Sequence, residues 1–251
     1  MKDFYFLVSL PRAGNTLLAT LINQNDKVCC TSNSIILDIL WDVQRIKKYR
    51  GFLNFPDETS LDNVLTNVTN NYYKDFKANK IIDRGCWATD LNYKLLKDFV
   101  TPKPKFILLY RPIAECYASF MKAGIYKNEN EMVTHLMSED GFLNMAYTSI
   151  SNVLKSKDDY IFLTYNELVR DADNTVEKIF NFIDEKYVPI KTKNFKQFSA
   201  NNIVYDDSVL SAPHHIIRTK KITKQKLNVE DYISKELIEK SKEWDNKIFN
   251  V

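Results

Sequence analysis

Residues 4 to 18, FYFLVSLPRAGNTLL, constrain the fold of this chain more than any other stretch. Phe4 to Val8 form a continuous apolar run, which is typical of a strand buried on both faces of a parallel sheet. A short turn containing Gly14 follows, and apolar residues then recur at helical spacing. A strand, a tight turn and a helix in this order direct backbone N–H groups and the positive end of a helix dipole at one point. With the charge of Arg12 added, the stretch predicts a site for an anion with several oxygens.

Alternating strand and helix patterns continue along the chain. Further strands are predicted at 27–31, 80–83, 106–110 and 160–164, and helices at 16–24, 34–48, 60–78, 90–99, 112–120, 129–137, 141–155, 165–169, 173–183 and from 229 onward. Residues 50–58 are predicted to be a loop, and the predicted N-caps are Ser60, Asp140 and Asp173. This order predicts a single domain over residues 1–251, with a three-layer α/β/α fold and a central parallel sheet.

Composition limits the classes of partner. The chain has 251 residues, 45% of them hydrophobic, which is enough for one sizeable core. A net charge of +3 is too small to indicate nucleic-acid binding. No apolar stretch approaches the ~18–20 residues of a membrane span, and no signal peptide is visible. The four cysteines lack metal-ligand spacing, so we expect reduced thiols in a soluble, cytoplasmic protein.

Polar residues stand at the ends of several predicted strands. Because the carboxyl ends of parallel strands form one edge where ligands bind, we expect these residues to converge: 9–16, Asp83, Arg84, Arg111 and Tyr165. Ser119 follows Arg111 by eight residues, so a helix over 112–120 would offer a guanidinium and a hydroxyl to one phosphate. A surface arginine that caps this helix is the alternative interpretation of Arg111.

Three ordered segments resemble the sulfotransferases that use 3′-phosphoadenosine 5′-phosphosulfate (PAPS). They are the P-R-x-G-x-T turn after the first strand, the spacing YRPIAECYAS, and the segment YIFLTYNELV. The resemblance covers residue 4 to about residue 184. The turn lacks the first glycine and the lysine of the nucleotide P-loop G-x-x-x-x-G-K-[ST], and Asn166 stands where the family usually has an acidic residue.

The resemblance implies a P-loop-NTPase-like sulfotransferase fold and transfer of a sulfuryl group from PAPS, without a metal, to a hydroxyl or amine. The acceptor would be a carbohydrate or another small molecule, and adenosine 3′,5′-bisphosphate would be released. The implied cofactor contacts are Arg12, Ala13, Gly14, Asn15, Thr16 and Leu17 at the 5′-phosphosulfate, Arg84 beside them, Arg111 and Ser119 at the 3′-phosphate, Tyr165 near the adenine, and Arg218 from a late basic loop.

An acceptor hydroxyl needs a general base. Cytosolic sulfotransferases place a histidine after a middle strand, where this chain has Asp83-Arg84. Some carbohydrate sulfotransferases have Glu-Lys there, so the resemblance implies Asp83 as base, with Arg12 stabilising charge on the leaving phosphate. A local ion pair of Asp83 is the alternative, and His214 and His215 are rival bases. We expect His135, on a predicted helix, to be structural.

Two other functions remain open at the level of sequence. A kinase-like nucleotide phosphotransferase would need Mg²⁺ and a lysine in the turn, and the turn has no lysine. A non-catalytic nucleotide-binding protein on the same fold would bind without turnover. We expect no nucleic-acid partner and no membrane span, and a homodimer is indicated by the family resemblance alone.

Overall fold

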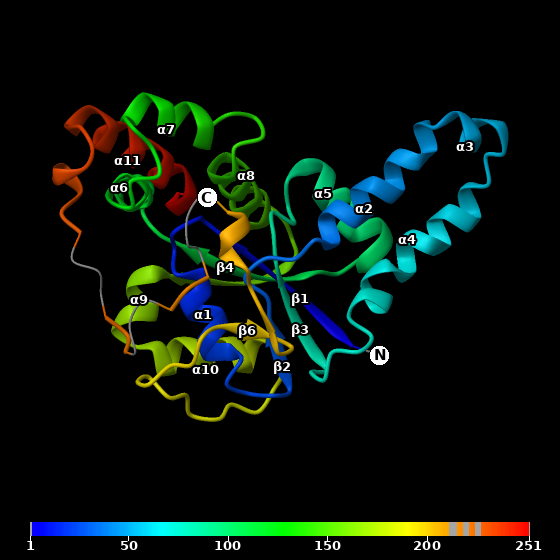
Figure 1. The fold of residues 1–251 in the computed structure, drawn as a ribbon, viewed down its shortest axis with the longest axis horizontal. Helices are drawn as coiled ribbons and strands as arrows, with labels where there is room; N and C mark the ends of the chain where they lie inside the picture. Colours follow the sequence, from blue (N-terminus) through cyan, green and yellow to red (C-terminus); the bar gives the residue numbers. More distant parts are fainter. Residues whose placement is uncertain (1, 211–214, 218–220, 224–226, 251) are drawn as a thin grey trace.

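A sheet of five parallel strands lies at the centre of the computed structural model, which describes residues 2–210, 215–217, 221–223 and 227–250 (Figure 1). The strand order is β2-β3-β1-β4-β5, so the first strand of the chain is the middle strand of the sheet. The strands are β1 Asp3–Ser9, β2 Val28–Cys30, β3 Lys80–Arg84, β4 Lys105–Tyr110 and β5 Asp159–Thr164. This arrangement confirms the predicted parallel α/β fold.

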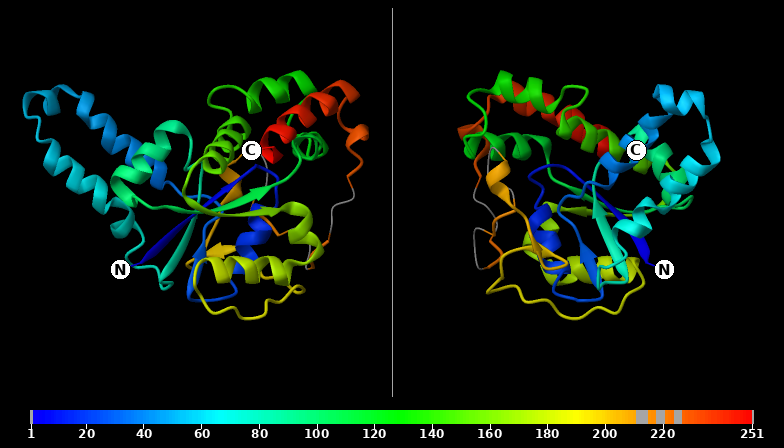
Figure 2. Two further views of the ribbon diagram at one scale, coloured as in Figure 1. Left: turned by 180° about the vertical axis from the view of Figure 1, so that it is seen from behind. Right: turned by 45° about the vertical axis from the view of Figure 1, so that its right-hand side comes forward.

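Helices cover both faces of the sheet and make the three layers. On one face lie α1 Asn15–Ile22 and α10 Ala172–Phe182, and on the other lie α5 Asp90–Leu95, α8 Phe142–Lys155 and α11 Lys235–Phe249 (Figures 1 and 2). The last turn of α5 widens into a π-helical segment, η2 Leu96–Val100. The other helices near the carboxyl edge are α6 Ile113–Lys122, α7 Glu129–Leu136 and α9 Tyr165–Arg170.

A helical hairpin over residues 36–72, which we call the arm, projects from the sheet (Figures 1 and 2). It consists of α2 Ile36–Arg45, the 3₁₀ turn η1 Ile46–Lys48, the short helix α3 Arg50–Asn54, and α4 Glu58–Tyr72. The predicted loop over 50–58 is therefore partly helical. Between α10 and α11 the described residues form a two-stranded ribbon, β6 Ser199–Ala200 and β7 Ile203–Val204, and the 3₁₀ turns η3 Asp207–Val209 and η4 Val229–Asp231.

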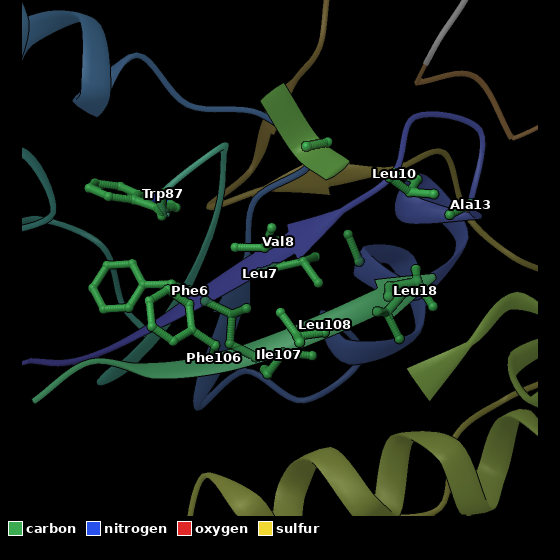
Figure 3. Packing of buried hydrophobic residues seen from close by; sticks show 14 of the residues in the cluster. Phe6, Leu7, Val8, Leu10, Ala13, Leu18, Trp87, Phe106, Ile107 and Leu108 are labelled. Carbon is green, nitrogen blue, oxygen red and sulfur yellow. The ribbon is translucent and has the colours of Figure 1, made fainter. Parts of the chain in front are cut away.

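The core is densest around β1, whose residues from Tyr5 to Ser9 are all buried. The Phe6 ring meets the Trp87 ring edge-on with centroids 5.0 Å apart (Figure 3). Leu10, Ala13 and Leu18 are fully buried where the turn leaves the sheet and enters α1 (Figure 3). Truncating a buried leucine of this kind to alanine costs about 2–5 kcal/mol. The apolar anchors therefore fix both ends of the turn between β1 and α1.

Three predicted helix caps are wrong because a neighbouring residue takes the position. The Asp57 carboxylate accepts the Ser60 N–H at 3.0 Å, so α4 begins one turn earlier than predicted. Asp171 likewise accepts the Asn174 N–H and displaces Asp173. At α8 the cap position belongs to Gly141 instead of Asp140.

In the part of the chain that the structure describes, no helix combines the length and the apolarity needed to cross a membrane.

Candidate active site

The turn between β1 and α1 has a left-handed backbone at two positions. Gly14, the N-cap of α1, has φ +94°, and Arg12 has φ +66°. A Cβ added at Gly14 would lie 3.1 Å from Cδ2 of Tyr165, so the position requires glycine for both its backbone and its space. Asn15 closes the turn by donating its side-chain N–H to the Leu10 carbonyl at 3.1 Å. The turn is thereby held so that the first-turn amides of α1 point out of the sheet edge.

The predicted contacts within this turn take different positions. Ala13 is fully buried and donates its backbone N–H to the Leu10 carbonyl at 3.2 Å, so its side chain serves packing. Arg12, Thr16 and Leu17 line the cavity described below. The Thr16 hydroxyl oxygen lies 3.4 Å from the hydroxyl oxygen of Ser32.

Arg111, directly after β4, is buried and ties three elements together. Its Nη1 donates to the Arg12 carbonyl at 2.9 Å, and its Nε donates to Glu115 on α6 at 2.9 Å. Its guanidinium carbon also lies 4.2 Å from the centroid of the Tyr165 ring. With 2% of its surface exposed, Arg111 is a structural part of the site and not a surface cap.

Ser119 contacts Arg12, whereas the sequence paired it with Arg111 at the 3′-phosphate. The Arg12 Nε donates to the Ser119 hydroxyl at 3.2 Å, and its guanidinium lies over the Phe120 ring at 5.7 Å. Because Ser119 is on α6, two turns after Arg111, this helix brings a hydroxyl and a guanidinium to the same side of the turn. Arg111 and Ser119, eight residues apart in the sequence, therefore both line the cleft, and each contacts Arg12.

Tyr165 begins α9, at the end of β5. Its position is fixed by a capping box in which Thr164 and Glu167 exchange hydrogen bonds. The ring lies close to Gly14 and to the Arg111 guanidinium. The Tyr165 ring therefore packs beside Arg111 and beside the turn between β1 and α1.

Arg84, the last residue of β3, reaches the same edge. Its Nε donates to the Ser9 hydroxyl and its Nη1 to the Ser32 carbonyl, both at 3.4 Å. It forms no ion pair with any carboxylate that the structure describes. Burial lowers the pKa of Arg84, because water is removed from its charge. A bound anion would stabilise the charged guanidinium and so offset the free-energy cost of its burial.

Asp83 is buried and does not itself line the cleft, although its carboxyl also interacts with the side chain of Ser34, which does. Successive side chains of a strand point to opposite faces, so Asp83 and Arg84 diverge. Trp87 donates its Nε1–H to Oδ1 at 2.9 Å, and the Tyr73 hydroxyl donates to Oδ2. Burial raises the pKa of Asp83, and these hydrogen bonds oppose the increase. Among described residues no ion pair of Asp83 within 4.0 Å exists, which removes the local ion-pair alternative.

His214 and Arg218 lie outside the described residues. His215 is described, and its Nδ1 lies 2.6 Å from Oδ1 of Asp207. Its ring stacks on Tyr205, with centroids 4.3 Å apart, and the Tyr205 hydroxyl in turn accepts the Ser32 N–H. An imidazole held by a carboxylate at Nδ1 presents Nε2 as its basic nitrogen. Sequence analysis named His215 but missed Asp207, eight residues earlier in an irregular stretch.

A cleft of about 1520 Å³ connects these groups. It is lined by the turn, the end of β3, and parts of α2, α5, α6, α7 and α8, together with Tyr165 and His215. His135, predicted to be structural, is one of the lining residues, with its Nδ1 2.7 Å from the Tyr126 hydroxyl. Five carboxylates also line the cleft, and none forms an ion pair with a residue that the structure describes: Asp38, Asp90, Glu131, Glu139 and Asp140.

The donors at this edge fit a ligand with two separate phosphate-like groups. The first-turn amides, Thr16 and Arg84 make one group of donors, and Arg111 with Ser119 makes the second. The Tyr165 ring lies beside the second group, which suits a planar base. Within the described ranges no three His, Cys, Asp or Glu side chains gather as a metal site. The fold and the site thus define an α/β protein with several N–H donors gathered at a helix N-terminus, an arrangement suited to a phosphorylated ligand.

Comparison with known proteins assigns the family. The sulfotransferase domain model matches residues 2–247, and the chain belongs to this family of transferases. No curated protein matches the sequence significantly.

Solved sulfotransferase structures share the fold at low sequence identity. Mouse sulfotransferase SULT7A1, solved in complex with PAP, has a TM-score of 0.57 and 14% identity over 98% of this chain and 84% of its own. The sulfotransferase domain of the Synechococcus PCC 7002 olefin synthase has a TM-score of 0.52 and 14% identity, covering 75% of this chain and 76% of its own. Sulfotransferase STF9 from Mycobacterium avium has a TM-score of 0.50 and 12% identity, covering 100% and 77%.

Proposed function

We propose that this sulfotransferase uses PAPS as donor and a hydroxyl or amine of a small molecule or carbohydrate as acceptor. The observation that carries the proposal is the buried Arg111, which joins the turn, Glu115 and the Tyr165 ring. Arg84 contacts a different set of partners, Ser9 and Ser32. When bound, PAPS supplies the sulfuryl group and leaves as adenosine 3′,5′-bisphosphate.

The residues have separate roles in this proposal. The amides of Gly14 to Leu17, Thr16 and Arg84 bind the 5′-phosphosulfate, and Arg12 stabilises the charge that gathers on the leaving phosphate. Arg111 and Ser119 bind the 3′-phosphate, with Arg218 joining them from the late basic loop. Tyr165 packs on the adenine.

The general base is His215 in this proposal. Support comes from its place in the cleft and from the Asp207 carboxylate at Nδ1, which orients the ring and stabilises the charge after Nε2 takes the acceptor proton. Asp83 was the base expected from the family resemblance, and it remains the competing assignment together with His214. Its two oxygens accept hydrogen bonds inside the core, so it would need to rearrange to reach an acceptor.

The acceptor is uncharged or cationic in this proposal. The five carboxylates of the cleft, which form no ion pair with a described residue, repel an anionic acceptor and attract an amine or a hydroxyl donor. The four cysteines are free thiols, which suits the reducing cytoplasm as the place of reaction.

Calorimetric titration tests the cofactor. We expect tight binding of adenosine 3′,5′-bisphosphate that does not depend on metal, and weaker binding of ADP with Mg²⁺. Preference for ADP with Mg²⁺ would favour a kinase-like phosphotransferase.

Binding of PAPS without transfer to any member of an amine and sugar panel would favour a non-catalytic binding protein. In the same panel, loss of transfer in His215→Gln but not in Asp83→Asn would identify the base, and the reverse result would return the role to Asp83.

A further inference from the structure

One end of the arm lies far from the sheet (Figures 1 and 2). Large apolar side chains are exposed there. We call residues 45–56 the arm tip. The exposed fractions are 60% for Tyr49, 65% for Leu53 and 73% for Phe55. Leu53 donates its backbone N–H to the Tyr49 carbonyl at 3.0 Å, so these two side chains follow each other by one turn. A cluster of apolar side chains on a projecting tip marks a surface that binds something.

The charge of the arm tip is entirely positive. It carries Arg45, Lys47, Lys48 and Arg50, and no Asp or Glu occurs between residues 43 and 56. Lys47 pairs with Glu58 and Asp62 on α4. Lys48 and Arg50 form no ion pair with any residue that the structure describes. Arg45 likewise pairs with Asp42, so Lys48 and Arg50 carry the positive charge of the arm tip that no ion pair within the described residues offsets.

We propose that the arm tip docks on the surface of an anionic phospholipid bilayer. Aromatic side chains such as Tyr49 and Phe55 are favoured at the boundary between headgroups and acyl chains, where Leu53 can bury its apolar surface. Lys48 and Arg50 then lie beside anionic headgroups. This membrane contact goes beyond the proposed transfer reaction and does not depend on it.

The geometry of the arm leaves the cleft open when the tip is docked. The first turns of α2 supply Leu37, Asp38 and Trp41 to the cleft, whereas the tip begins at the other end of that helix. The two sites therefore occupy opposite ends of one helix, and a bound bilayer does not cover the cofactor residues.

Vesicle flotation with the full chain tests the proposal. We expect binding to vesicles of phosphatidylcholine mixed with phosphatidylglycerol, weaker binding to phosphatidylcholine alone, and a loss of binding as salt increases. The double variant Lys48→Glu/Arg50→Glu should lower the partition coefficient for the anionic vesicles by about tenfold or more. Leu53→Ser/Phe55→Ser should remove binding to both kinds of vesicle. Val188→Ser, which replaces a 56% exposed side chain elsewhere, should bind like wild type.

Two readouts separate the proposal from its rivals. Titration with adenosine 3′,5′-bisphosphate should be unchanged in both arm variants, which shows that they are folded. Light scattering after gel filtration measures self-association. If wild type does not float with the anionic vesicles, the proposal is wrong. It is equally wrong if Leu53→Ser/Phe55→Ser converts a dimer to a monomer and no vesicle binds, because the tip is then a contact between two copies.

Discussion

Replacement of Arg111 is the most direct test of the proposed cofactor site. An arginine has five N–H donors, and in the structure one is used on Glu115 and one on the Arg12 carbonyl. Three donors remain on Nη1 and Nη2. These can form two charge-assisted hydrogen bonds to one phosphate, since the fork matches its oxygens.

The expected magnitude follows from this count. A hydrogen bond to a charged group contributes about 1.5–3 kcal/mol. With values of about 1.5–2 kcal/mol, at the lower end of this range, the loss of two bonds in Arg111→Ala should weaken binding of adenosine 3′,5′-bisphosphate by about 3–4 kcal/mol. At about 1.4 kcal/mol for each factor of ten, the affinity falls roughly 100- to 1000-fold. Arg111→Lys keeps the charge but loses the fork, and we expect a loss of roughly tenfold.

Calorimetry on purified variants measures these affinities. Because Arg111→Ala leaves Glu115 without its partner, the free energy of unfolding should be measured in urea alongside. Arg170→Ala replaces an exposed arginine on α9 and is the matched control, with unchanged affinity expected. If folded Arg111→Ala binds the bisphosphate within about threefold of wild type, which is under 1 kcal/mol, the assignment of Arg111 to the phosphate is refuted.

Three further predictions concern stability and its link to the site. Gly14→Ala should lower the free energy of unfolding by at least about 1–2 kcal/mol, because alanine is strained in the left-handed backbone conformation. It should also weaken bisphosphate binding, because the new Cβ meets Tyr165. The control Gly124→Ala, with φ +66° and open space around it, should lose stability but not bisphosphate affinity, and an equal loss of affinity in both variants would contradict this prediction. The raised pKa of Asp83 means that the folded chain holds this proton above about pH 4, where the unfolded chain releases it, so wild type should lose stability as pH increases above that value. In Asp83→Asn, the free energy of unfolding in urea should not show this decrease between pH 4 and pH 8. The prediction is refuted if the free energy of unfolding depends on pH in the same way in both proteins. Thr164→Ala removes the cap of α9 and should cost about 1 kcal/mol in thermal unfolding, whereas an unchanged melting temperature would show that the capping box is dispensable.

The fold was predictable because its signals are local. The apolar runs from Phe4 and from Phe106 are continuous, and they became the central strands β1 and β4. Helix starts were less predictable, because two neighbouring residues can each cap a helix, such as Asp57 and Ser60 or Asp171 and Asp173, and only the folded backbone determines which one does. The N-caps are Asp57 and Asp171, and the hydrophobic periodicity of the sequence does not indicate this choice.

The site was predictable where spacing within one element sets the geometry. Ser119 lies two turns after Arg111 on α6, and the structure keeps both at the turn. Partners far apart in sequence were not predictable, such as the contact between Arg111 and the Arg12 carbonyl, 99 residues apart. The direction of Asp83 was also missed, because a change of one residue along a strand reverses the face of the sheet.

The central place of β1 in the sheet has a consequence for folding kinetics. Both neighbours of the first strand come much later in the chain, at residues 80–84 and 105–110, so the sheet cannot close until over 100 residues can meet. Contacts at such sequence separation make folding slow. Gly14 and Arg12 are held by Tyr165 and Arg111, so the phosphate turn becomes complete only after these distant segments have docked. Recovery of bisphosphate binding during refolding should therefore be one of the last steps. The fluorescence change that accompanies burial of Trp87 should occur earlier or at the same time.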